Sequence, residues 1–289
     1  MPYSSNAEPL ASETRASKPR MSRLQKLLFF LTAWLICLMP FLFWWNTWFG
    51  RTLSDPQLTA YLHDTKKPRH IQQALVQIGE RITRHDANAR QWYPDLVRLA
   101  TDPVAEVRNT DAWVMGEDTS GSGFHEMLLK MLSDPAQMVR GNAALSLVRF
   151  GDATGRPEIL ALLQPAQIAS PQSGRILDSD RPGTAIHQDG LIAKIQYSNG
   201  QTAEIRSPIP GRIRTVAGTG SNLAAGAEVA IVDPATEQVW EALRALYLIG
   251  QLEDLPVVRP YERDVADVSN DVRHQALETE QAIRKRAGS

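Results

Sequence analysis

Two copies of one short phrase constrain the fold of this chain more than any other feature. They are Asp102-Pro-Val-Ala-Glu-Val-Arg108 and Asp134-Pro-Ala-Gln-Met-Val-Arg140, and an Ala-containing apolar run follows each copy. We expect the Asp to cap the next helix and the Pro to lie in its first turn, while small alanines let neighbouring helices approach closely. A phrase repeated at this period predicts stacked helical hairpins.

The helical pattern extends well beyond the two phrases. From residue 55 to residue 165, apolar residues recur at spacings of three and four, with breaks at Asp, Pro and Gly. Pro157–Leu163 begins a pair whose second helix is missing locally. The run Val239–Gly250 has the expected texture and is predicted to complete that pair, so the helical array resumes after an interruption.

These residues resemble the HEAT repeat family, especially the bacterial type first noticed in phycobilisome lyases. The best copy is Val139-Arg140-Gly-Asn-Ala143-Ala144, which ends at Gly151-Asp152, and Val107-Arg108-Asn-Thr-Asp111-Ala112-Trp113 is a second copy. A third copy, around residues 64 to 79, is degenerate. The resemblance implies a curved α-solenoid that offers an extended concave binding surface.

Residues 166–235 interrupt the helical pattern with short alternating runs that Gly and Pro separate. Such runs predict strands, and Asn199-Gly200 predicts a two-residue hairpin turn. The segment is therefore expected to form a small all-β module inserted into the helical array.

The second half of this insert resembles the biotinyl/lipoyl family, through Ser207-Pro208-Ile-Pro-Gly211 and then Gly220 and Gly226 around Leu223. The resemblance implies a flattened barrel, a barrel-sandwich fold, whose carrier lysine would stand at a hairpin tip. The predicted tip, Tyr197–Thr202, has no Lys, and Lys194 lies three residues earlier. We therefore expect no cofactor, with Lys194 as a disfavoured modification site and a docking or spacing role favoured.

A long apolar run precedes the helical array. No charged residue occurs from Leu27 to Gly50, and the far end carries Trp44, Trp45 and Trp48. A run of this length predicts a transmembrane helix over residues 23–50, and the tryptophans are typical of a membrane interface. The alternative, a cleaved signal peptide, is disfavoured because its apolar region is shorter and ends in small residues.

The charges beside this run predict its orientation. Only Arg51 follows it closely, whereas five basic residues precede it, namely Arg15, Lys18, Arg20, Arg23 and Lys26. Cations are retained on the cytoplasmic side. We expect a single-pass protein of the bacterial inner (cytoplasmic) membrane, with a cytoplasmic N-terminus and the bulk of the chain periplasmic or otherwise extracytoplasmic.

The sequence carries few signs of catalytic chemistry. The net charge of −1 disfavours bulk nucleic-acid binding, and Cys37 is the only cysteine, which excludes a disulfide framework. The six histidines are dispersed, and no Gly-x-Ser-x-Gly elbow occurs. We therefore predict no enzyme activity, no catalytic residue and no metal site.

The repeated Arg and Asp residues are predicted to be structural, with each Arg paired to the turn Asp of its own or a neighbouring repeat. An anion-binding row of arginines is the alternative. These repeat positions are Asp102, Arg108, Asp134, Arg140, Asp267 and Arg273. Asp111 with Glu117-Asp118 forms an acidic cluster that a solvated loop explains better than a cation site does.

The predicted fold class is mainly α: one transmembrane helix, then an α-solenoid of HEAT-like hairpins with an inserted lipoyl-like module. The predicted domains are a disordered tail (1–22), the transmembrane helix (23–50), HEAT-like repeats (55–165), the β module (166–235) and resumed repeats (236–286). The favoured function is a non-catalytic scaffold or accessory subunit that binds protein partners in or at the membrane within an envelope complex. A periplasmic adaptor of an export system and a lyase or maturation factor are the alternatives, and the oligomeric state stays open.

Overall fold

The computed structural model describes residues 22–48, 52–263 and 268–288. Residues 1–52 form one unit, which contains helix α1 (Arg23–Trp48), and Leu53–Ser289 form a second, compact unit. The predicted disordered tail lies almost wholly outside the described residues, as does Asp267.

Helix α1 corrects the membrane predictions. Within the described ranges, no helix combines the length and the apolar character that a bilayer crossing requires. This finding overturns the predicted transmembrane helix over residues 23–50. It equally overturns the inner-membrane, single-pass location with a periplasmic bulk, because that location was deduced from the same helix and its flanking charges.

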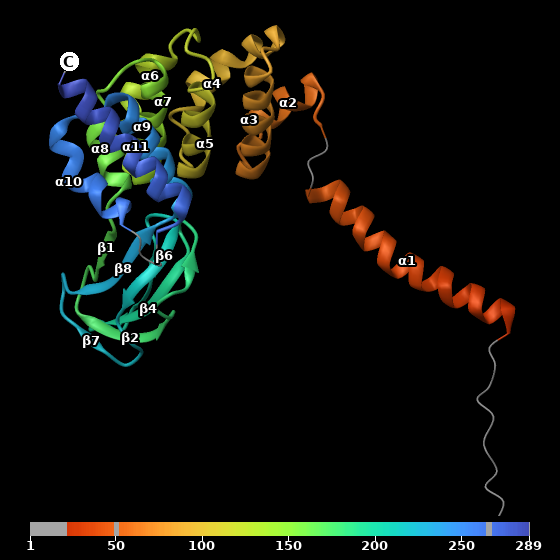
Figure 1. Ribbon diagram of the computed structural model, residues 1–289. Helices are drawn as coiled ribbons and strands as arrows, with labels where there is room; N and C mark the ends of the chain where they lie inside the picture. Colours follow the sequence, from red (N-terminus) through yellow and green to blue (C-terminus); the bar gives the residue numbers. More distant parts are fainter. Residues whose placement is uncertain (1–21, 49–51, 264–267, 289) are drawn as a thin grey trace, which may run out of the picture. The chain divides into compact units, whose positions relative to one another are not determined.

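The compact unit begins with a succession of helices joined by short turns (Figure 1). They are α2 (Asp55–Leu62), α3 (Pro68–Thr83), η1 (Ala87–Trp92), α4 (Tyr93–Leu99), α5 (Ala105–Met115), α6 (Phe124–Met131), α7 (Gln137–Arg149) and α8 (Arg156–Leu162). After the strands come α9 (Thr236–Ile249), η2 (Leu252–Asp254), α10 (Leu255–Val258), η3 (Arg259–Glu262) and α11 (Asn270–Ala287).

The longer helices form one row. α3 packs on α5, α5 on α7, α7 on α9 and α9 on α11, and the shorter helices pack behind them. One apolar core lies under α2 to α7, and a second lies under α7 to α11. Side-chain hydrogen bonds join neighbours in the row: the Ser146 hydroxyl donates to the Ala112 carbonyl at 2.8 Å, and the Thr279 hydroxyl donates to the Leu243 carbonyl at 2.9 Å.

Each Asp-Pro phrase forms a local turn and not a helix cap. Asp102 Oδ1 accepts a hydrogen bond from the Val104 N–H at 2.9 Å, and helix α5 begins only at Ala105. Pro103 therefore lies in the turn, outside the helix, and the Asp134 phrase repeats the arrangement. The predicted capping is wrong because an Asp side chain readily closes a turn on the backbone two residues ahead.

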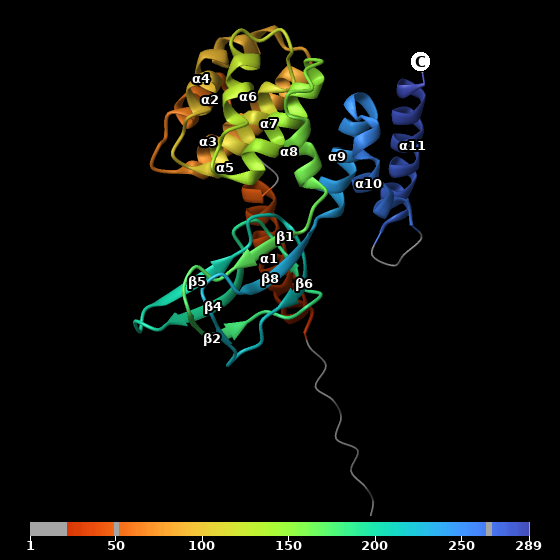
Figure 2. The same cartoon turned by 90° about the vertical axis from the view of Figure 1, so that its left-hand side faces the viewer.

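Eight strands lie between α8 and α9. They are β1 (Ala166–Ala169), β2 (Gly174–Ser179), β3 (Ala185–Ile186), β4 (Leu191–Tyr197), β5 (Thr202–Arg206), β6 (Gly211–Val216), β7 (Asn222–Leu223) and β8 (Glu228–Pro234). They form two antiparallel sheets with the orders β1-β8-β6-β3 and β5-β4-β2-β7, whose facing apolar residues make a third core. Figure 2 shows these sheets beside the helices.

Glycines fix two details of the sheets. At Gly211 a Cβ atom would stand 1.8 Å from the Asp233 carbonyl oxygen, so only glycine lets β6 approach β8 there. Gly200 has φ +83° and closes the β4–β5 hairpin, while Asn199 does not share this left-handed conformation. The predicted two-residue turn needs φ > 0 at both residues, so the hairpin instead closes through a longer loop.

The structure also corrects the predicted fold class. The chain combines helices with two four-stranded antiparallel sheets and, in the part that the structure describes, lacks a membrane-spanning helix. It is therefore not the single-span, mainly α solenoid that the repeated phrase suggested. The phrase reports local turns and helix contacts, and these do not by themselves specify a solenoid.

Candidate functional site

The repeated Arg and Asp residues were the first site candidates, and Arg108 occupies the most enclosed position. Arg108 Nε and Nη2 donate to the two carboxylate oxygens of Asp134 at 2.6 and 2.9 Å, and Nη1 donates to the Asp102 carbonyl at 2.7 Å. Burial favours a raised pKa for Asp134, but hydrogen bonds from Arg108 and the Ala136 N–H lower it below the ordinary value. This fork ties the turn before α7 to helix α5.

The other repeat positions do not join Arg108 in one site. Arg140 pairs with Glu158 at 2.8 Å and not with an Asp carboxylate, although it also donates to the Asp134 carbonyl at 2.9 Å. Arg273 lies in the first turns of α11, and Asp267 lies outside the described residues. Arg108 and Arg140 therefore tie different pairs of segments, which argues against one anion-binding row.

Lys194 lies in the middle of β4. In the sheet register it stands opposite Asp178 of β2 and Glu204 of β5. A carrier lysine needs an exposed turn, which this strand position does not offer.

Asp111 is the residue that sequence reasoning misjudged. It was assigned to a solvated acidic cluster, but its side chain is fully buried in α5, and neither carboxylate oxygen has a hydrogen-bond partner among the described residues. Burial raises the pKa of Asp111 well above its ordinary value, against the opposing charge of Arg98. The signal was available, because Asp111 falls one turn after the buried Val107 on the same helix face.

The other members of the acidic cluster have partners. Glu117 pairs with Arg149 at 2.6 Å, and Asp118 accepts a hydrogen bond from the Tyr93 hydroxyl at 2.5 Å. Burial and the Asp118 carboxylate raise the pKa of Tyr93 to about 12. Across residues 22–48, 52–263 and 268–288, no group of three His, Cys, Asp or Glu side chains is placed to hold a metal ion.

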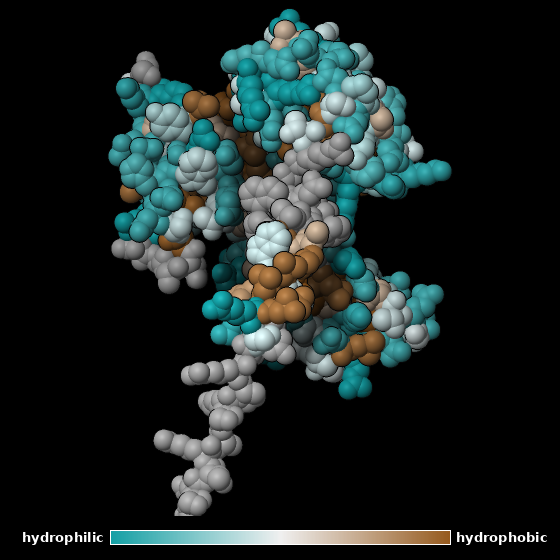
Figure 3. Space-filling view, turned by 90° about the vertical axis from the view of Figure 1, so that its right-hand side faces the viewer, coloured by the Kyte–Doolittle hydropathy of each residue, from teal (hydrophilic) through white to brown (hydrophobic). Residues whose placement is uncertain are grey.

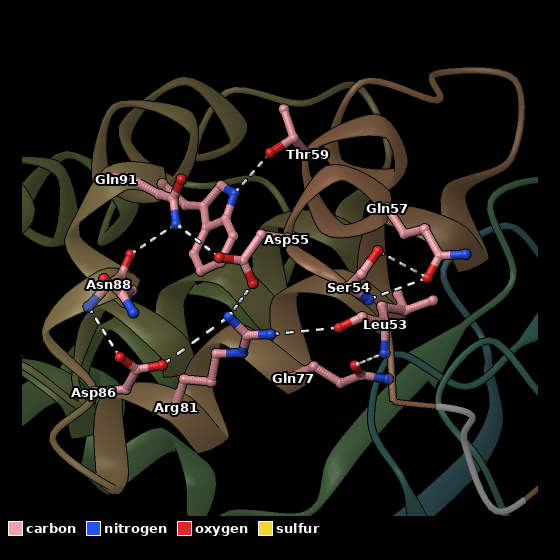
Figure 4. Close-up of polar contacts among 11 residues, drawn as sticks. Leu53, Ser54, Asp55, Gln57, Thr59, Gln77, Arg81, Asp86, Asn88 and Gln91 are labelled. Atoms are coloured by element: carbon pink, nitrogen blue, oxygen red, sulfur yellow. Dashed lines mark hydrogen bonds and ion pairs between the residues drawn. The ribbon is translucent and has the colours of Figure 1, made fainter.

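A polar network closes the N-terminal end of the compact unit (Figure 4). Arg81 Nη1 lies 2.6 Å from Asp55 Oδ1, and Nη2 donates to the Leu53 carbonyl at 3.3 Å. The guanidinium also lies 5.2 Å from the ring centroid of Trp92, whose indole N–H donates to the Thr59 hydroxyl at 2.9 Å. The hydrogen bond from Arg81 lowers the pKa of Asp55. These groups bond to one another, so the network joins the start of the compact unit to α3 and leaves few polar groups free for a ligand.

Unlike that polar network, a groove on the row of helices carries exposed apolar side chains. It has a volume of about 510 Å³ and residues from α5, α7, α9 and α11 line it. Three large apolar or aromatic side chains in it stay exposed, Trp113 by 37%, Tyr247 by 43% and Leu248 by 59%. In the upper half of Figure 3, apolar residues gather in a hollow between two groups of helices. Single exposed apolar residues are ordinary, but several that converge in one concave surface indicate an interaction site.

A second cavity of about 560 Å³ lies between the first turns of α9 and α11. Its lining includes Trp240 together with the carboxylates of Glu237, Glu241 and Asp271. Glu241 and Gln275 line both cavities, so the groove and this acidic cavity are neighbours on one surface. Sequence reasoning missed both cavities. The adjacent Tyr247 and Leu248 on an otherwise amphipathic helix were the one signal for the groove.

Comparisons with known proteins give this surface no precedent. No protein-family model matches the chain, and no curated protein matches it. The HEAT-repeat and lipoyl-like assignments therefore gain no support from them.

Proposed function

We propose that this protein is a non-catalytic binding module that holds a segment of a partner protein in the groove between α5, α7, α9 and α11. The observation that carries the proposal is the convergence of Trp113, Tyr247 and Leu248, all solvent-exposed, in one groove. Apolar grooves between helices accept the apolar face of an amphipathic segment, which anchors side chains one helical turn apart.

The shape of the groove suits such a segment. Its volume of about 510 Å³ lies within the range of about 300–1,000 Å³ that is common for ligand-binding clefts. Asn142 and Gln275 add polar groups to the lining, and Asn142 donates to Asn109 at 2.9 Å, so α5 and α7 hold a fixed spacing. The lining also carries charged side chains, those of Arg149, Arg244, Glu241 and Glu278, so it suits an amphipathic segment that makes both apolar and polar contacts.

Site-specific photo-crosslinking in the source cells tests this proposal. A crosslinker in place of Leu248 should give a discrete protein adduct, whereas one in place of Leu252 should not. Leu252 is a matched control, since it is 52% exposed but does not line the groove.

Binding of the adducted protein should then depend on the groove. Leu248→Asp in the full-length chain should weaken its affinity at least about tenfold, since a charge in an apolar anchor site costs more than about 1.4 kcal/mol. Leu252→Asp should leave the affinity unchanged. Equal adducts from both positions, or equal affinities of the two variants, would contradict the proposal.

A further inference from the structure

We propose that the partner segment is basic, and that one of its Lys or Arg side chains docks in the acidic cavity between α9 and α11 while its apolar side chains occupy the groove. This inference rests on the proposed function and adds the chemistry of the partner. Four observations on the described residues carry it.

Carboxylates line the acidic cavity together with His274, whose ring lies 3.7 Å from Glu278. Glu237, Glu241 and Asp271 contribute carboxylates, and neither Lys nor Arg belongs to the lining. Glu237 and Asp271 are exposed, and no ion pair joins either of them to another described residue. In the part of the chain that the structure describes, the carboxylates of Glu237 and Asp271 therefore have no Lys or Arg partner.

The cations of the neighbouring groove are already engaged. Arg149 pairs with Glu117 at 2.6 Å. Arg244 approaches Glu241 at 3.4 Å, and its guanidinium lies 4.6 Å from the ring centroid of Trp240. Neither arginine is thus available to the two carboxylates at the far side of the cavity.

The spacing of the acids costs stability in the free protein. Glu237 and Glu241 lie four residues apart on one face of α9, where like charges repel by about 0.2–0.5 kcal/mol. Acids in the first turn of a helix stabilise its dipole, which accounts for Glu237 and for Asp271 of α11. Glu241 lies one turn further on, where Arg244 approaches it at 3.4 Å, so a partner cation would chiefly offset the charges of Glu237 and Asp271.

The cavity also suits the aliphatic part of a basic side chain. Trp240 and Val272 supply apolar surface beside the carboxylates. Lys and Arg lay their methylene stems on such surface and keep the charged end among polar groups. Glu241 and Gln275 line both cavities, so a single extended or helical segment spans the groove and the acidic cavity together.

The test starts with a random peptide library displayed on phage and selected against the full-length protein. Selected peptides should combine large apolar residues with at least one Lys or Arg. A synthetic peptide from this selection is then titrated with its cation intact, changed to Gln or changed to Glu. Each removed cation should weaken binding about two- to fivefold, as an exposed ion pair does. Added salt should reduce the difference.

A charge exchange identifies the site. Glu237→Lys should weaken the basic peptide about five- to tenfold, because attraction becomes repulsion, and should strengthen the Lys-to-Glu peptide by a similar factor. Glu80→Lys is the matched control, since Glu80 is an exposed helical carboxylate of α3 that lines neither cavity. It should change neither affinity.

The remaining outcomes separate the two proposals. Peptides that lose affinity with Leu248→Asp but are indifferent to their own cations and to Glu237→Lys would overturn this inference and leave the proposed function standing. If no selected peptide depends on Leu248, both proposals fail. Sedimentation analysis tests whether the protein associates with itself. Self-association that Glu237→Lys abolishes would show that a second copy occupies this surface, and it would overturn the inference of a basic partner segment.

Discussion

The two ends of the compact unit differ in whether their charged side chains have partners within the protein. At the N-terminal end, Arg81 pairs with Asp55, donates to the Leu53 carbonyl and lies over the ring of Trp92. At the C-terminal end, Glu237 and Asp271 line a cavity without an ion-pair partner among the described residues. The first group of charges is paired within the protein and joins its segments, whereas the second group is available to a partner. The comparison predicts that charges of the first kind determine stability and charges of the second kind determine binding.

The largest effect is expected for the most enclosed pair. Arg108→Ala leaves the Asp134 carboxylate, whose side chain is only 8% exposed, without its cation. Removal of one partner of a buried pair costs about 3–5 kcal/mol of unfolding free energy. Chemical denaturation of the purified protein measures the loss.

Arg84→Ala is its matched control. Arg84 lies 3.7 Å from Glu80, and both side chains are exposed, so its loss should stay below about 0.5 kcal/mol. Equal losses for the two variants would remove the distinction between enclosed and open charges.

Asp111 tests the same comparison in another way, because it is buried and yet has no hydrogen-bond partner among the described residues. The folded-state pKa of Asp111 is raised. The pH-dependent contribution of this carboxyl to the unfolding free energy is therefore greatest below its unfolded-state pKa of about 4, where the group is neutral in both states. That contribution is lost as the pH rises through the raised folded-state pKa. Asp111→Val should therefore stabilise the protein by about 1–2 kcal/mol at pH 7, where the unsatisfied buried group is removed.

A pH series of denaturation curves checks this sign. The wild-type protein should lose stability relative to Asp111→Val as the pH rises above about 4. A constant difference across the series would mean that Asp111 does not change its protonation between the folded and unfolded states.

The smallest effect is expected at the open end. Glu237→Gln should change the unfolding free energy by less than about 0.5 kcal/mol, because lost dipole stabilisation and relieved repulsion with Glu241 have opposite signs. Thermal denaturation of the full-length protein measures it. A loss above about 1 kcal/mol would mean that Glu237 is structural, and the comparison between the two ends would fail.

Local sequence patterns predicted where helices and strands lie, but they did not predict how the turns between them close or which distant segments pack together. Alternating runs such as Leu191–Tyr197 correspond to a strand, and the Ala-rich runs correspond to α5 and α7. The choice of Glu158 as partner of Arg140 depends on how α8 packs on α7, which no spacing within the phrase encodes. The charge-free run from Leu27 to Gly50 predicted a transmembrane helix, but no helix among the described residues is long and apolar enough to cross a membrane.

The candidate site was still less accessible from sequence. Trp113 and Leu248 lie far apart in the chain. The groove forms only when α7 packs on α9, and these two helices are separated in sequence by the eight strands. Burial of Asp111 was missed because a charged residue was read by its type and not by its helix position. Surface sites that depend on contacts between distant segments leave little local signal.

The pairing of β1 with β8 has a consequence for how this chain can vary. Ala166 and Val232 are register partners, so the path leaves α8 and returns to α9 at nearly the same point. The helices on either side already pack on each other. Replacement of the strands by a short connector would then add little loop-closure entropy. The path of the chain between α8 and α9 therefore accommodates a longer or a shorter sheet segment.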